Sequence, residues 1–107
     1  MADIMLFIET PIFTEDVSAL LTDEEYRLFQ VFLTCSPESG DVIPHSGGLR
    51  KVRWLAKNKG KRGGVRVIYF HKNADSIIRL LLIYPKGVKD DLNEAEKRFL
   101  RQMNERW

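Results

Sequence analysis

The sequence is poor in cysteine and in long apolar runs. Its one cysteine, Cys35, has no partner for a disulfide within the chain, and this usage is typical of a reducing compartment. The longest apolar run, residues 80–84, has the length of a strand and falls far short of the roughly 20 residues of a membrane-spanning helix. Residues 1–9 lack the basic leader of a secretory signal. We therefore expect a cytoplasmic protein that does not contact a membrane.

Acidic residues are missing from a long central stretch. Between Val42 and Ala74 there is no Asp or Glu, whereas the same stretch contains nine Lys and Arg residues. Most of the acids lie in two flanking blocks, residues 9–25 and 90–105. The net charge is only +2, so a local positive field arises from segregation of charge rather than from an excess. This pattern favours a polyanionic partner, with nucleic acid as the first candidate.

The 107 residues are enough for a single domain, 1–107, with its own core. Capping-box patterns at Thr22–Glu25 and Asn93–Glu96 predict the starts of two helices. The predicted elements are a strand at 4–8, helices at 11–21 and 23–36, strands at 49–55, 65–70 and 77–84, and a C-terminal helix. The continuous apolar character of 77–84 indicates a strand covered on both faces. The order β-α-α-β-β-β-α predicts an α+β fold, a small antiparallel β-sheet with two N-terminal helices and one C-terminal helix packed over a face.

Apolar residues at helical spacing predict which helix faces are buried. In the second helix the spacing indicates a buried stripe of Leu28, Val31, Phe32 and Cys35, with Cys35 as a small hydrophobic residue of the core. In the last helix Phe99 and Met103 share a face, and with Trp107 they face either the core or a protein partner.

Four segments resemble a known toxin family. They are GLRKVRW at 48–54, KGKRGG at 59–64, RVIY at 66–69 and LIYPK at 82–86, and DLN at 91–93 before the last helix fits the same pattern. Together they resemble the HigB-type branch of the RelE/ParE superfamily, toxins of type II toxin–antitoxin systems. The resemblance covers almost the whole chain in the same order.

The resemblance implies a RelE-like fold and a ribosome-dependent endoribonuclease, or mRNA interferase. Such a toxin enters the ribosomal A site, contacts 16S rRNA, cleaves the mRNA and stops translation and growth. It uses no metal and no cofactor. Its implied partner is a cognate antitoxin, usually of the helix-turn-helix HigA type, through which alone the toxin reaches operator DNA.

The residues offer groups for this chemistry, which needs a base, an acid and stabilisation of phosphorane charge. Lys51 and Arg53 point to the same face of their strand, and Arg66 joins them if the two strands pair as a hairpin. Because arginine binds two phosphate oxygens at once, we assign Arg66 as the transition-state clamp and Arg53 as its assistant.

The remaining roles stay open at this point. Lys51 or Lys59 is the candidate base if neighbouring cations and partial burial favour its neutral form. Tyr84 orients the ribose or stacks on a base, and Lys86 acts as the acid or binds a phosphate. The residues expected to contact RNA or the ribosome are Arg50, Lys57, Lys61, Arg62 and Lys72.

Two other functions compete with this prediction. A ParE-like inhibitor of DNA gyrase shares the fold but cleaves nothing, so the fold cannot separate the two. A basic nucleic-acid-binding module without toxicity is the third reading. The combined set of Lys51, Arg53, Arg66 and Lys86 favours the nuclease.

Overall fold

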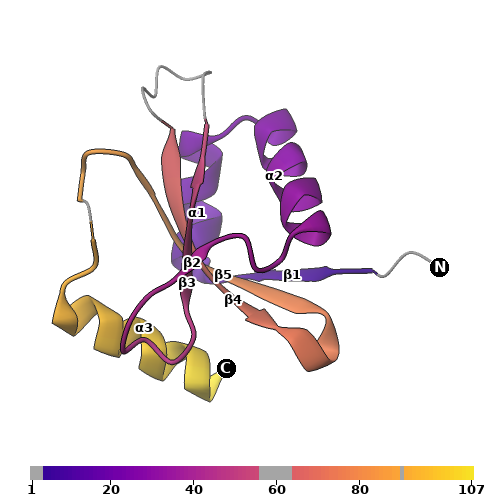
Figure 1. The fold of residues 1–107 in the computed structure, drawn as a ribbon. Coiled ribbons are helices and arrows are strands. Elements are labelled where there is room, and N and C mark those ends of the chain that lie inside the picture. The colour runs from indigo at the N-terminus through magenta and orange to yellow at the C-terminus, as the bar shows by residue number, and fades with distance from the viewer. Residues whose placement is uncertain (1–3, 56–63, 90) are drawn as a thin grey trace.

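The computed structural model describes residues 4–55, 64–89 and 91–107. Its elements in chain order are β1 (Leu6–Glu9), α1 (Pro11–Leu20), α2 (Asp23–Cys35), β2 (Asp41–Val42), β3 (Arg50–Trp54), β4 (Val65–Lys72), a 3₁₀ turn (Asn73–Asp75), β5 (Ile77–Pro85) and α3 (Glu94–Arg106). The predicted α+β class, with two N-terminal helices and one C-terminal helix, is confirmed (Figure 1). Within the described residues no helix combines the length and the apolar character needed to cross a membrane.

The strands form one sheet in the order β1-β5-β4-β3-β2. The β3–β4 and β4–β5 pairs are antiparallel, as expected for two successive hairpins. β1 departs from the expected antiparallel sheet, because it lies parallel to β5 and makes the sheet mixed. The helices α1 and α2 and the strands β2 to β4 lie between β1 and β5 in the sequence. A parallel pair requires a long crossover connection of this kind. The two-residue β2 was not predicted, since two residues are too few to show alternation.

Side-chain caps fix where each helix begins. Thr10 caps α1 by accepting a hydrogen bond from the Phe13 backbone N–H, and its own hydroxyl donates to the Leu81 carbonyl of β5. The capping boxes predicted at Thr22–Glu25 and Asn93–Glu96 are both present, with each side chain reaching the other residue's backbone N–H. The local sequence therefore sets the helix starts, and Thr10 also ties α1 to the sheet.

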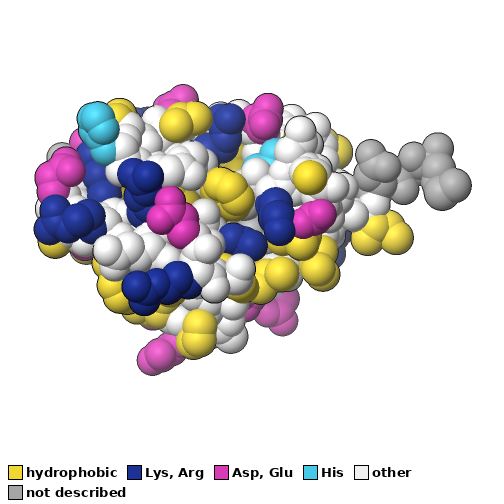
Figure 2. All heavy atoms as spheres, turned by 90° about the horizontal axis from the view of Figure 1, so that it is seen from below, with side chains coloured by type: hydrophobic (Ala, Val, Ile, Leu, Met, Phe, Trp, Pro, Cys, Tyr) yellow, Lys and Arg dark blue, Asp and Glu magenta, His cyan; other side chains and the backbone are white. Residues whose placement is uncertain are grey.

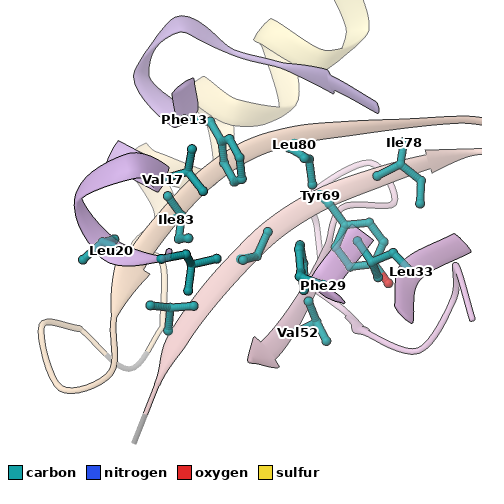
Figure 3. Packing of buried hydrophobic residues seen from close by; sticks show 13 residues of the cluster. Phe13, Val17, Leu20, Phe29, Leu33, Val52, Tyr69, Ile78, Leu80 and Ile83 are labelled. Carbon is teal, nitrogen blue, oxygen red and sulfur yellow. The ribbon is translucent and has the colours of Figure 1, made fainter. Parts of the chain in front are cut away.

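The helices cover both faces of the sheet, whereas the sequence predicted one covered face. α1 and α2 pack on one face and α3 on the other (Figure 1). Figure 3 shows the first cluster, in which side chains of α1 and α2 meet alternate residues of β3, β4 and β5. The intervening residues of β4 and β5, such as Ile68 and Leu81, form the second cluster with Leu100 of α3. The prediction that residues 77–84 are covered on both faces is thus confirmed.

The buried face of α2 differs from the predicted stripe. Of the predicted stripe, Phe32 does pack against the core, partly buried, but Leu28 is 45% exposed and Val31 and Cys35 are exposed as well. Phe29 and Leu33 are fully buried instead. Phe29 packs edge-on against Trp54 of β3, with ring centroids 5.4 Å apart. Two apolar series run along α2 at helical spacing, and the one that carries the larger aromatic surface is buried. The expected core position of Cys35 is wrong for this reason.

Candidate functional site

One row of side chains crosses three strands on the face covered by α3. Arg53 of β3 lies opposite Arg66 of β4, and Arg66 lies opposite Tyr84 of β5. Lys51, two residues before Arg53, lies opposite Ile68 of the α3-side core. Since paired residues share a face, the predicted grouping of Lys51, Arg53 and Arg66 in one hairpin is confirmed.

Arg66 is buried in a manner unusual for a charged residue. Only 7% of its surface is exposed, and its buried Nη1 has no hydrogen-bond partner in the part of the chain that the structure describes. Among these described residues no carboxylate forms an ion pair with Arg66 or with the exposed Arg53 opposite. A buried donor left unsatisfied costs about 1–3 kcal/mol. An incoming anion would gain hydrogen bonds here that the protein does not supply, from the exposed Arg53 and from the small part of Arg66 that solvent reaches.

Acids near the start of α3 hold two lysines beside this row. The Lys51 Nζ donates to Asp91 Oδ1 at 2.6 Å, and this hydrogen bond and charge lower the pKa of the Asp91 carboxyl. Lys89 donates to Glu96, and this bond, followed by that from the Asn93 backbone N–H, lowers the pKa of Glu96. The capping box that fixes the start of α3 also places Glu96 for this contact.

Lys89 joins the site although the sequence reasoning did not select it. Its Nζ lies 5.8 Å from the centroid of the Tyr84 ring, a cation–π distance. Tyr84 itself is only 6% exposed and belongs to the core under α3. Lys89 lies within the segment between LIYPK and DLN, and its charge was the only signal that sequence offered.

The backbone of Lys86 lies beside Gly64, where the connection from β3 to β4 ends. Its backbone N–H donates to the Gly64 carbonyl at 3.1 Å, which extends the β4–β5 ladder by one step past Pro85. Gly64 has a φ of +79°, and a Cβ there would lie 2.1 Å from the Trp54 carbonyl oxygen. Only glycine fits this position. The side chain of Lys86 is exposed, so it is accessible to a ligand at this edge.

The structure separates two predicted RNA-contacting residues from the row. Arg50 faces the α1–α2 side, opposite Tyr69, and its Nη1 donates to the carbonyls of Glu38 and Gly40. Lys72 lies at the far end of β4 and forms an ion pair with Asp75 at 2.8 Å. The other predicted residues, Lys57, Lys59, Lys61 and Arg62, lie outside the described residues, and their roles stay predictions.

The surface on the α3 side of the molecule carries mixed charge. Figure 2 views the molecule from the side on which α3 lies in Figure 1 and shows Lys and Arg side chains spread over this face, with acidic and apolar side chains between them. The ion pairs of Lys51 and Lys89 belong to this mixture. Specific contacts at the row, rather than a uniform positive field, therefore have to select a ligand.

An apolar groove runs between the start of α1 and the outer side of α3. Two adjoining cavities, of about 540 and 590 Å³, share Thr10, Pro11, Phe99 and Met103 in their walls. Phe99 is 65% exposed there, and Ile12 and Trp107 are also exposed. Of the residues whose location was open, Phe99 and Trp107 thus face solvent, whereas Met103 packs partly against the core.

A scan against models of known protein families finds no match to this chain. The resemblance to the toxin family thus depends on the sequence segments described above. The geometry of the row is the independent ground on which a function can be argued.

Proposed function

We propose that this protein is the toxin of a type II toxin–antitoxin system, a RelE/HigB-like endoribonuclease that cleaves mRNA in the ribosomal A site. The observation that carries the proposal is the Arg53–Arg66–Tyr84 row, with a buried Arg66 donor left unsatisfied among the described residues. A buried charged donor without a partner calls for an explanation, and the binding of an anion is one that also accounts for the exposed Arg53 opposite. This proposed substrate implies that the protein acts in the cytoplasm.

In the proposed reaction the ribose 2′-oxygen bonds to the adjacent phosphorus, and the bond from phosphorus to the 5′-oxygen breaks. The products are a 2′,3′-cyclic phosphate and a 5′-hydroxyl end. Arg66 and Arg53 donate hydrogen bonds to the non-bridging oxygens as their charge grows. Preorganised donors of this kind need no reorganisation during the step, which is the reason for holding Arg66 so firmly between β3 and β5.

Two protons move in this reaction, and the exposed Lys86 is placed to deliver one of them to the leaving 5′-oxygen. The proton of the 2′-hydroxyl goes to a base, for which Lys51 and Lys59 are the candidates. The Lys51 Nζ already donates to Asp91 Oδ1, so we favour Lys59 as the base and a binding role for Lys51. The small exposed surface of Tyr84 supports orientation of the ribose rather than stacking on a base.

The decisive experiment is primer extension on a defined mRNA in a reconstituted translation system, with and without ribosomes. The variant is Arg66→Met, because methionine fills the buried space that alanine would leave empty. We expect wild-type cuts at the A-site codon only with ribosomes, and a loss of more than about tenfold in Arg66→Met. Arg27→Met, which removes an exposed arginine of α2, is the matched control and should cut like wild type.

Unchanged cutting by Arg66→Met would contradict the assignment of the clamp. Growth arrest by the wild-type protein without any ribosome-dependent cut would contradict the nuclease itself. In that case a supercoiling assay with DNA gyrase tests the alternative of a ParE-like inhibitor. High-affinity binding to RNA without a ribosome, and without toxicity, would instead favour a passive binding module.

The proposed partner besides the ribosome is a HigA-type antitoxin, which alone contacts operator DNA. Exposed apolar patches mark protein interfaces, and the most exposed aromatic side chain of the α1–α3 groove is Phe99, at 65%. We propose that an apolar segment of the antitoxin binds in this groove. Phe99→Asp should abolish co-purification of the antitoxin. Val88→Asp, at an equally exposed residue outside the groove, should leave it intact.

A further inference from the structure

A polar cavity of about 360 Å³ lies beside the arginine row, between the segment 41–44 and the start of α3. Its size is at the lower end of small-molecule pockets. Ile43, Pro44 and Leu92 form its apolar walls, and two aspartates and two lysines form the polar part of its lining. The lining residues are Asp41, Val42, Ile43, Pro44, Lys51, Asp91, Leu92 and Lys97.

Along β3, the cavity is two residues away from the row that would hold the phosphate. Lys51 lines the cavity, and Arg53 lies two residues further along β3 on the same face. Two residues of a strand span about 7 Å. A nucleotide whose phosphate contacts Arg53 and Arg66 therefore has its neighbour within reach of this cavity. This placement depends on the proposed function.

The Lys51–Asp91 pair has a defined pattern of donors and acceptors. The ammonium of Lys51 donates, and it lies 2.6 Å from Asp91 Oδ1, beside which the second carboxylate oxygen accepts as well. Read in order, the pair offers a donor, an acceptor and an acceptor. A planar ligand edge that reads acceptor, donor, donor would complement all three positions.

Among the four RNA bases only guanine has that edge, with O6 as acceptor and N1–H and N2–H as donors. Uracil reads acceptor, donor, acceptor and complements two positions. Adenine and cytosine begin with an amino donor and oppose the ammonium. The walls formed by Ile43, Pro44 and Leu92 suit the flat face of a base.

We propose that this cavity binds a guanine base of the RNA substrate, with Lys51 and Asp91 reading its Watson–Crick edge. Asp91 is then a specificity-determining residue of the proposed nuclease. This role gives a reason for a carboxylate at the side of a phosphate-binding row, where it otherwise weakens the attraction for RNA.

The first test uses the protein without ribosomes. Guanosine, uridine, adenosine and cytidine 5′-monophosphates are titrated into the isotope-labelled protein, and the backbone amide signals of Ile43, Lys51, Asp91 and Leu92 are followed by NMR. We expect guanosine monophosphate to bind about tenfold more tightly than the adenosine and cytidine nucleotides, which is the discrimination typical of a bidentate contact to a base. Uridine monophosphate should fall between them.

The variant Asp91→Asn gives a sharper result, because an amide offers an acceptor and a donor where the carboxylate offers two acceptors. Together with Lys51 it complements uracil, so the preference should change from guanine to uracil. A purely structural role of the ion pair predicts no such change. Glu105→Gln, which removes a carboxylate of α3 that pairs with Arg101 and not with a residue of the cavity, should keep the guanine preference.

Equal shifts with all four nucleotides, or a guanine preference that survives Asp91→Asn, would overturn the proposal. The same variants in the ribosome assay, on mRNAs that differ only in the A-site codon, separate this proposal from the proposed function. Equal cleavage of all these mRNAs would contradict the guanine site but not the proposed nuclease activity. A guanine preference in the titration without any cleavage supports the site and contradicts the nuclease.

Discussion

Arg53 and Arg66 lie directly opposite each other in the antiparallel pairing of β3 and β4. Like charges at opposed positions destabilise a sheet, and Arg66 is buried as well. Stability alone would not select this pair. An anion that binds both side chains would relieve the repulsion.

The arginine pair predicts a trade-off between stability and activity. Arg66→Met removes one like charge and an unsatisfied buried donor, so its free energy of unfolding should exceed that of wild type by about 1 kcal/mol. Urea denaturation of the two proteins measures this. Arg27→Met, at an exposed residue with a surface ion pair, should change the value by less than about 0.5 kcal/mol. A clear loss of stability in Arg66→Met would mean that the guanidinium supports the fold.

The buried face of α2 can be tested with two neighbouring residues. Phe29→Ala removes a fully buried ring that packs on Trp54 and should cost about 3–5 kcal/mol in the free energy of unfolding. Leu28→Ala, at a residue 45% exposed, should cost less than about 1 kcal/mol. Thermal unfolding of both variants, followed by circular dichroism, provides the comparison. The reverse order would restore the stripe predicted from the sequence.

The ion pairs near the start of α3 predict a loss of stability in acid. Hydrogen bonds from Lys51 and Lys89 lower the pKa values of Asp91 and Glu96 in the folded protein, so the unfolded chain binds protons first as the pH falls. The stabilisation is complete above the pKa values of the unfolded chain and disappears as the pH falls through those of the folded protein. Denaturation of wild type and Glu96→Gln from pH 7 to pH 2 should show a stability difference that shrinks on acidification. A difference independent of pH would contradict this contribution of Glu96.

The exposed side chain of Cys35 predicts a thiol that reagents reach in the native protein. The disulfide reagent DTNB should modify Cys35 in buffer to the same final extent as in denaturant, because no opening of the core is required. A reaction that needs denaturant would place Cys35 back in the core. Cys35→Ser should abolish the reaction.

The sequence predicts those parts of the fold that depend on local chemistry. The capping residues Thr22 and Asn93 mark helix starts because the hydrogen bonds lie within four residues of sequence. The hairpin that joins Arg53 to Arg66 follows from the short separation of the two strands. The parallel pairing of β1 with β5 depends on contacts between distant segments, which no local pattern records, whereas the apolar run at 77–84 did indicate that both faces of β5 are covered.

The candidate site likewise has parts that the sequence predicts and parts that it does not. Strand alternation places Lys51 and Arg53 on one face, so their grouping was predictable. The contact of Lys51 with Asp91 spans forty positions of the chain and was not. Arg50 was assigned with its neighbours because of its charge, although alternation already directs it to the opposite face. Strand alternation alone would have separated Arg50 from Lys51 and Arg53.

The parallel pairing of β1 with β5 has a consequence for folding during synthesis. β5 lies inside the sheet, between β1 and β4, and contributes Ile78, Leu80 and Ile83 to the core beneath α1 and α2. A chain emerging from the ribosome thus makes its first strand and two helices long before their partner exists. Tyr84, at the end of β5, arrives later still. The nascent chain therefore completes the core and the arginine row together, only after β5 has been synthesised.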